Sequence, residues 1–394
     1  MKRTLLLILV IISLGHFMNH VALGVLPALF PIIRRDIPLS YTEMGMLGTA
    51  VALIAAITNY LSGRLADKKG AEKILAGGLT VLSLAVLVTA YIKCFLEFLV
   101  TRILEGIGSG SWHPPAATYT AKKFPKKRLG FAFSIQGSAG IVGSAVAPLF
   151  VVPLAAIYNW RVSLLFSGGI VLLVAIILLF TLTRKDIVEA DSCNNTIENS
   201  SRSNIEMSRG ISAVSFAHFI ILMILLVIAR NSAFRTIIYF TSIFLNDIGN
   251  YDPIMSGLLT SVVLGFGAIG GLLGGKVVDR FSSLFTLRIS TFSAGVIFVV
   301  LFFYQKNILF LLSLVTLLFF FGMPGLESYV VKMSSSEKRG EVYGIIFSVG
   351  PIVSAFSPMF FGYIADLFGL QYVFIIVAFL LISGFVITLL LPKD

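Results

Sequence analysis

Long apolar segments, separated by short polar stretches, follow one another along almost the whole chain. The first extends from Leu5 to Ile33, and none shows the alternation of polar and apolar residues typical of a barrel strand. Eleven more lie near residues 43–62, 74–92, 96–117, 131–153, 162–182, 213–245, 253–274, 289–304, 308–331, 342–365 and 372–391. A backbone in hydrocarbon must pair its amides internally, so each segment predicts a membrane-spanning helix. We therefore expect an all-α membrane protein with 12 transmembrane helices.

The composition agrees with this pattern and excludes a water-soluble fold. Of the 394 residues, 57% are hydrophobic and only 12% are charged, and the mean hydropathy is +0.96. Such a composition is typical of proteins that cross the membrane many times. We expect a multi-pass protein of the cell membrane (plasma or inner), in contact with the lipid bilayer and acting as a monomer.

Basic residues are distributed unevenly between alternate loops. If both termini are cytoplasmic, the cytoplasmic segments hold most of the 30 Lys and Arg residues. The opposite loops hold only Arg34, Arg35, Lys93, Arg161 and Lys306. The positive-inside rule therefore predicts cytoplasmic termini, and it accounts for the net charge of +11 without a nucleic-acid partner. In this topology Cys94 lies near the outside and Cys193 in the cytoplasm, which excludes a disulfide between them.

The two halves of the sequence resemble each other. At an offset of 212 residues Asn19 aligns with Asn231, and at an offset of 210 further matches begin at Pro114. A parallel repeat of this kind predicts two pseudo-symmetric six-helix bundles, over residues 1–183 and 213–394, joined by a polar cytoplasmic linker over 184–212. Transporters built from two such halves bind substrate between the halves and open to each side of the membrane in turn.

Three short motifs resemble those of the major facilitator superfamily. "GRLADKKG" (63–70) resembles the superfamily's signature between its second and third helices, and "GKVVDR" (275–280) resembles the degenerate copy in its second half. Arg102 and Glu105 stand in a stretch that resembles the pattern of its fourth helix. The resemblance implies the superfamily's fold. It also implies a cytoplasmic gate formed by Gly63, Arg64, Asp67, Lys68, Gly70, Gly275, Asp279 and Arg280.

Within this superfamily the chain resembles the fosmidomycin-resistance-type efflux branch. The likeness lies in "HFMNH" (16–20), "GIGSGSWHP" (106–114) and "SIQGSAGIVGSAVAPLF" (134–150). The last stretch also resembles the glycine-proline motif of antiporters, with Gly140, Gly143 and Pro148 as helix-bending positions, although plain helix packing explains these residues equally well. Two acids of the branch are replaced here, by His20 and Pro115.

Five ionisable residues fall inside predicted spans, where an unpaired charge is costly. They are Arg102, Glu105, Arg230, Arg235 and Glu327. Arg102 and Glu105 are i,i+3 neighbours on one helix face. They act either as an internal brace or as a proton-exchanging carboxylate with an arginine that senses its charge.

The seventh predicted span carries a polar stripe. Asn231, Arg235 and Tyr239 recur at intervals of four residues, which places them on one helical face, and Arg230 lies beside it. A cavity lining explains two arginines at these positions. Their charge indicates either an anionic substrate or an internal partner among the two acids of the other spans.

The first span carries a second polar face. His16, Asn19 and His20 share one side of the helix, where they either carry a coupling proton or hydrogen-bond to neighbouring helices. His113 precedes two prolines that end or kink its helix, so we expect it to pack at the kink. We also place it, with the polar residues of the other spans, in the candidate substrate and proton-coupling cavity.

No motif in the sequence is typical of an enzyme. It has no nucleotide-binding loop, no nucleophile elbow and no Cys/His spacing of a metal site, so we expect neither catalysis nor a cofactor or metal. We predict a secondary transporter that exports a small organic solute in exchange for protons. Two alternatives stay open: proton- or cation-coupled uptake of an organic anion, and a membrane sensor or binding protein that no longer transports.

Overall fold

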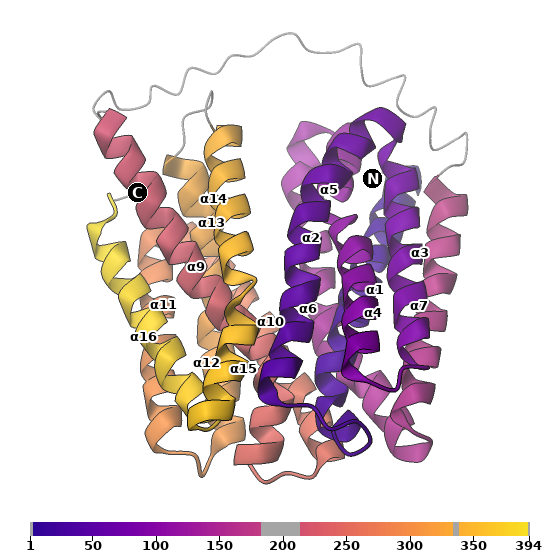
Figure 1. Cartoon of the computed structure of the whole chain (residues 1–394). Coiled ribbons are helices and arrows are strands. Elements are labelled where there is room, and N and C mark those ends of the chain that lie inside the picture. The colour runs from indigo at the N-terminus through magenta and orange to yellow at the C-terminus, as the bar shows by residue number, and fades with distance from the viewer. Residues whose placement is uncertain (1–2, 183–212, 334–338, 393–394) are drawn as a thin grey trace. The chain divides into compact units, whose positions relative to one another are not determined.

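The protein is built from helices (Figure 1). The structure, a computed structural model, describes residues 3–182, 213–333 and 339–392, and this part of the chain contains no strand. The elements are α1 (Arg3–Ile33), α2 (Tyr41–Lys69), α3 (Ala71–Thr89), α4 (Phe95–Gly110), α5 (His113–Lys123), α6 (Lys126–Ile157), α7 (Trp160–Leu182), α9 (Ala213–Ile243), the π-helix η2 (Phe244–Ile248), α10 (Pro253–Arg280), α11 (Ser283–Phe303), α12 (Ile308–Phe321), α13 (Met323–Met333), α14 (Arg339–Ser354), α15 (Ser357–Phe368) and α16 (Tyr372–Leu390).

The helices match the predicted spans closely. Among the described residues, 11 helical stretches are long and apolar enough to cross a membrane. Three predicted spans are each divided into two helices: the span near 308–331 at Gly322, the span near 342–365 at residues 355–356, and the span near 96–117, where α4 ends at Gly110 after 16 residues and α5 begins at His113. Pro114 and Pro115 lie in the first turn of α5, where the missing proline N–H costs no helical hydrogen bond. An all-helical membrane protein is therefore confirmed, with three of its predicted spans broken.

The described chain divides into two compact units. One draws on Met1–Leu26 and Leu53–Met207, and the other on Pro27–Ala52 and Ser208–Asp394. The end of α1 and the beginning of α2 thus belong to the same unit as the second half of the chain. The bundle boundaries at 183 and 213 stay predictions, and the predicted linker over 184–212 lies outside the described residues.

Equivalent helices pack in the same way inside each unit. In the first unit α3 packs against α4 and α7, and in the second unit α11 packs against α12 and α16. These elements correspond under the sequence repeat, so the repeated pattern specifies the same local packing twice.

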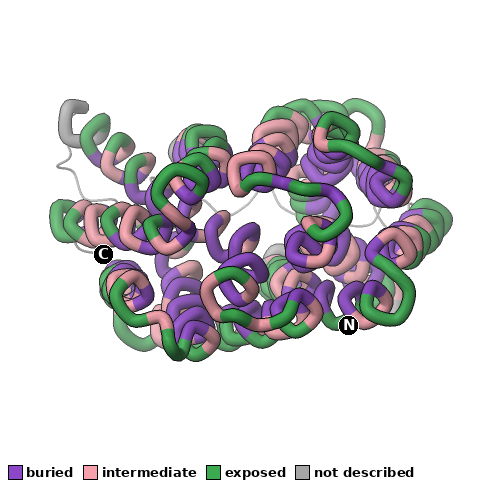
Figure 2. The backbone as a smooth tube through the Cα atoms, turned by 60° about the horizontal axis from the view of Figure 1, so that its bottom comes forward, coloured by how far each residue is buried: buried purple, intermediate pink, exposed green. Residues whose placement is uncertain are grey.

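Buried and exposed residues alternate along the same helices (Figure 2). The exposed side chains include many large apolar ones, such as Phe180 at 70% and Phe303 at 77% of full exposure. Apolar side chains on the outside of a helix are expected where the helix faces lipid. The exposed apolar surface therefore supports a membrane environment.

Glycines bring α4 close to its neighbours. A Cβ atom at Gly108 would collide with the backbone of Leu82 on α3, and one at Gly110 would collide with Ala55 on α2. The Ser62 hydroxyl also donates to the Gly110 carbonyl, at 3.0 Å. Close packing on two sides holds the polar face of α4 in one position.

Candidate functional site

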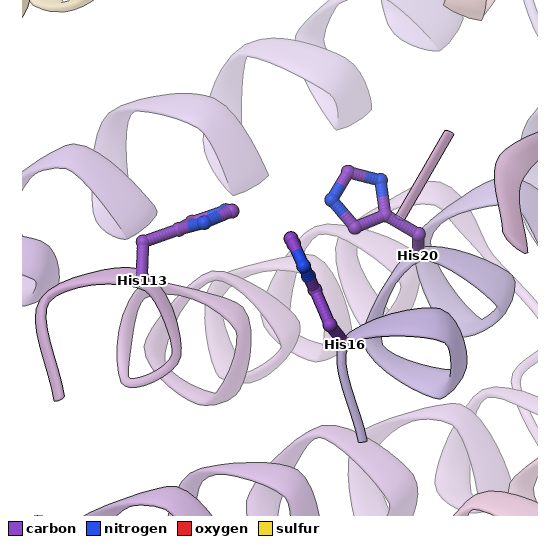
Figure 3. Close-up of side chains that lie close together, drawn as sticks. All are labelled: His16, His20 and His113. Carbon is purple, nitrogen blue, oxygen red and sulfur yellow. The ribbon is translucent and has the colours of Figure 1, made fainter. Parts of the chain in front are cut away.

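Three histidines of the first unit surround a common space (Figure 3). His16 and His20 lie one turn apart on α1, and His113 is the first residue of α5. The His16 ring centroid is 4.9 Å from that of His20 and 5.1 Å from that of His113, and one ring nitrogen from each of the three lies within 4.8 Å of the others. The sequence predicted the shared face of His16 and His20 but assigned His113 to packing at the kink.

Helix α6 holds two of these rings in place. The Nδ1 atom of His16 lies 2.8 Å from the Gln136 carbonyl oxygen, and that of His20 lies 3.1 Å from the Ser144 hydroxyl. A Cβ atom at Gly140 would lie 3.0 Å from the His16 ring, so a larger residue would press on the ring where α6 passes α1. These contacts are the interhelical hydrogen bonds that the polar face of α1 suggested.

Arg102 and Glu105 form an ion pair on α4. A side-chain nitrogen of Arg102 donates to a carboxylate oxygen of Glu105, and the two side chains are only 1% and 2% exposed. Asn19 of α1 lies at hydrogen-bond distance from the Ser109 hydroxyl, one turn further along α4. The first unit thus brings the polar faces of α1 and α4 together.

Arg230 is buried among neutral groups in the second unit. Its guanidinium donates to the Thr291 hydroxyl at 2.8 Å, the Ser290 hydroxyl at 3.3 Å and the Phe319 carbonyl at 2.8 Å. It also lies 4.6 Å from the centre of the Phe319 ring, a cation–π distance. Arg230 has no ion pair with any described carboxylate.

The residues of the α9 stripe have surroundings different from those of Arg230. Arg235 makes one long hydrogen bond, of 3.5 Å, to the Pro351 carbonyl, and its Nε atom has no partner. Asn231 is half-buried, and the Tyr239 ring is buried against Gly48 of α2. Glu327, on α13, is exposed and pairs with neither arginine among the described residues.

The predicted gate motif lies at the junction of α2 and α3. Gly70 has φ +91°, a conformation that glycine adopts at no steric cost, and this explains the glycine that closes the motif. A Cβ atom at Gly63 would meet Pro114 at 3.3 Å. The side chains of Arg64, Asp67 and Lys68 are exposed. In the second copy, Gly275 and Arg280 lie on α10, and the Asp279 side chain is outside the described part.

Sequence reasoning missed the neutral residues that position the charged and titratable ones. Gln136 and Ser144 hold the histidines, and Ser290 and Thr291 hold Arg230. Gln136 and Ser144 stand in the stretch that resembles the efflux branch, but nothing in their spacing connects them to α1. Ser290 and Thr291 could have been noticed as two adjacent polar residues in an otherwise apolar span.

Comparison with known proteins now identifies the fold. A sequence model of the Major Facilitator Superfamily matches residues 12–328 of the chain. The chain belongs to the Major Facilitator Superfamily. It is therefore a membrane transporter rather than an enzyme, and its apolar helices agree with a multi-pass protein of the cell membrane.

Several curated relatives are transporters. An uncharacterized MFS-type transporter of Bacillus subtilis, YfnC, is 26% identical over 98% of this chain and 93% of its own length. Multidrug resistance protein 2 of the same organism is 23% identical over 97% of this chain and 94% of its own. A probable sulfoacetate transporter of Cupriavidus necator, SauU, is 27% identical over 43% of this chain and 39% of its own.

A solved structure supports the fold at lower identity. A bacterial homologue of the human lysosomal transporter Spinster, in an inward-facing and unoccupied conformation, superposes with a TM-score of 0.80. It covers 99% of this chain and 97% of its own at 16% identity, which is evidence for the fold alone.

Proposed function

We propose that this transporter exports a small organic anion in exchange for protons by alternating access. The observation that supports an anion is the pair of arginines on α9, buried Arg230 and half-buried Arg235, neither of which has a carboxylate partner among the described residues. Arg230 is 1% exposed, so its charge is held away from bulk solvent.

A buried arginine favours a negatively charged ligand for two reasons. A cation inside a membrane protein is costly, so it is usually compensated by an opposite charge or by water in a cavity. The guanidinium also presents a planar set of N–H donors that matches carboxylate, sulfonate and phosphate oxygens. The Nε atoms of both Arg230 and Arg235 lack a hydrogen-bond partner. The relative described as a probable sulfoacetate transporter is consistent with an anionic substrate.

For coupling we propose the ion pair of the first unit. Glu105 would exchange the proton, and Arg102 would respond to the charge of its carboxylate. Arg102 has two nitrogen atoms without a partner, so Glu105 is the group that compensates its charge. A proton on Glu105 would remove that compensation and favour a rearrangement of the pair.

Export is proposed from the antiporter-like glycines and proline of α6 and from the full-length similarity to Multidrug resistance protein 2. Gly143 and Gly140 both allow α1 to approach α6 closely, because a Cβ atom at either would meet α1. Uptake of the anion is the alternative for direction, and a binding protein without flux is the alternative for class.

The test uses the purified protein in proteoliposomes loaded with sulfonates, uronates or lipophilic cationic drugs. With an imposed inward proton gradient we expect expulsion of an anion, and we expect Arg235→Gln to weaken anion transport by about tenfold or more. Arg288→Gln is the matched control, since Arg288 lies on α11 and donates to the Thr388 carbonyl.

Each other outcome removes one element of the proposal. Accumulation of the anion would reverse the direction. Transport of cationic drugs without transport of anions would remove the anionic substrate. Anion binding without flux would indicate a binding protein that does not transport.

A further inference from the structure

The three histidines have a geometry that the transport proposal does not use. We propose that His16, His20 and His113 form a binding site for a divalent transition-metal ion. One ring nitrogen from each residue lies within 4.8 Å of the other two, and the rings are contributed by two different helices. Figure 3 shows the three rings turned toward one space rather than stacked away from it.

The hydrogen bonds of His16 leave one nitrogen ready to bind a metal. A carbonyl oxygen can only accept, so the Nδ1 atom that lies 2.8 Å from the Gln136 carbonyl must carry the proton. The Nε2 atom of His16 then has a free lone pair, and it is buried without any hydrogen-bond partner. Metal-binding histidines commonly donate their second nitrogen to a carbonyl in this way.

For His20 the partner is a hydroxyl, which can donate as well as accept. The Ser144 hydroxyl can donate to the Gly140 carbonyl, at 3.4 Å, and accept from the Nδ1 atom of His20, at 3.1 Å. This arrangement leaves the Nε2 atom of His20 without a proton. Both imidazoles are thus oriented by α6 before any ion arrives, with Nε2 as the ligand atom that each neutral ring offers.

His113 completes the site and provides access to it. His113 is exposed, in contrast to buried His16 and half-buried His20, so an ion can reach the group from its side. Nitrogen ligands about 2.0–2.1 Å from a tetrahedral Zn²⁺ lie about 3.3 Å apart. The ring nitrogens therefore need to approach one another by at most about 1.5 Å, which small side-chain rotations of the three histidines can supply.

The ligand chemistry selects the class of ion. Three neutral imidazoles suit Zn²⁺, Co²⁺, Ni²⁺ or Cu²⁺, whereas Mg²⁺ and Ca²⁺ prefer oxygen ligands. Three protein ligands also leave a position open for water or for an anionic group. The sequence suggested no metal site because His113 lies far from the other two along the chain.

The experiment measures metal binding by the full-length protein. The protein is purified through an affinity tag that contains no histidine, treated with a chelator, and titrated with Zn²⁺ by calorimetry and with Co²⁺ by visible absorption. We expect one equivalent of each ion, with the absorption of nitrogen-ligated Co²⁺. His113→Ala is expected to weaken Zn²⁺ affinity by at least tenfold, and so is His20→Ala.

His218→Ala is the matched control, because His218 is the fourth histidine of the chain and lies outside the group. Cys94→Ser tests the exposed free thiol as a competing ligand. Unchanged Zn²⁺ affinity in His113→Ala and His20→Ala would overturn the proposal. Loss of Zn²⁺ binding in His218→Ala or in Cys94→Ser would overturn it too. X-ray absorption of the Zn²⁺-loaded wild type counts the imidazole ligands directly and does not depend on the folding of a variant. Fewer than three imidazole ligands would overturn the proposal as well.

Discussion

The ion pair on α4 concentrates two charges in a nearly dry environment. Arg102 and Glu105 are 1% and 2% exposed, and two of the three side-chain nitrogen atoms of Arg102 have no hydrogen-bond partner. Removing one member of such a pair leaves an uncompensated charge, which typically costs about 3–5 kcal/mol. The same pair can therefore be a structural brace and a proton-sensitive element, and a single substitution affects both roles.

A neutral residue at position 105 distinguishes the roles. We expect Glu105→Gln to abolish solute flux driven by a proton gradient, because the amide cannot exchange a proton. We also expect lower thermal stability, because Arg102 loses its partner. The measurement is flux in proteoliposomes with and without a pH gradient, together with thermal unfolding of the purified protein.

The control is the double variant Arg102→Gln with Glu105→Gln, in which neither charge is present. It is expected to recover most of the thermal stability while gradient-driven flux stays absent. Normal gradient-driven flux in Glu105→Gln would exclude Glu105 as the proton carrier. Recovery of that flux in the double variant would favour the brace.

Two helix breaks lie at equivalent places in the two halves of the chain, and one of them positions His113. One break separates α4 from α5 at residues 111–112, and the other separates α12 from α13 at Gly322. Pro114 and Pro324 follow these breaks and are equivalent in the repeat. Each of these two prolines lies in the first turn of the helix that follows the break, where its missing N–H costs no helical hydrogen bond. The first break brings His113 to the beginning of α5, where its ring can meet α1.

Polar contacts within the second unit join its segment 27–52 to the rest of that unit. Arg34 forms an ion pair of 2.6 Å with Asp247, and the Tyr41 hydroxyl donates to the same carboxylate. Burial lowers the pKa of the Arg34 guanidinium, but the hydrogen bond and charge of Asp247 outweigh burial and raise it. Asp366 of α15 accepts hydrogen bonds from the amides of Tyr41 and Thr42, at 3.0 and 2.8 Å. It therefore caps the N-terminus of α2 from a distant helix.

Loss of this cap is expected to loosen the first turn of α2. Asp366→Ala should lower the unfolding free energy by about 1 kcal/mol or more, because it removes the acceptor for two amides and the Thr42 hydroxyl. Hydrogen exchange should rise at the amides of Tyr41 and Thr42. Thermal unfolding and amide exchange followed by mass spectrometry measure the two effects.

Asp252→Ala is the matched control, since Asp252 caps its own helix, α10, through the amides of Ile254 and Met255. It is expected to lower stability by a similar amount without changing exchange in α2. Unchanged exchange at Tyr41 and Thr42 in Asp366→Ala would mean that the local Ser40–Glu43 capping box alone holds this turn.

Charge distribution determines how the whole chain is expected to lie in the membrane. Basic residues are concentrated in the loops that the prediction assigns to the cytoplasm, including the stretch 122–128. Such residues are retained on the cytoplasmic side during insertion. The family establishes a multi-pass transporter, and the orientation of its termini stays a prediction.

The two natural cysteines test this orientation. We expect a membrane-impermeant maleimide to label Cys94 on intact cells, because Cys94 is exposed and precedes α4 on the predicted outer side. Cys193 should react only after the cells are permeabilised. Cys94→Ser and Cys193→Ser assign each signal, and labelling of Cys193 on intact cells would reverse the topology.

Local patterns in the chain were sufficient to predict the helices and the family. Apolar runs that match a bilayer have few ways to pair their backbone, and short motifs such as residues 63–70 indicate the superfamily without any knowledge of distant contacts. They also singled out Arg102, Glu105, Arg230 and His16 as unusual residues of the spans. The repeat further indicated that equivalent helices would pack alike, as α3 and α11 do.

Spatial assembly was needed to show which of these residues meet. His113 joins His16 and His20 because α4 breaks before it and because Gly140 lets α6 press against α1. Arg230 finds Thr291 through the rotation and crossing of α9 and α11. Such contacts depend on how side chains of separate helices interlock, and linear spacing within one helix carries no record of that packing.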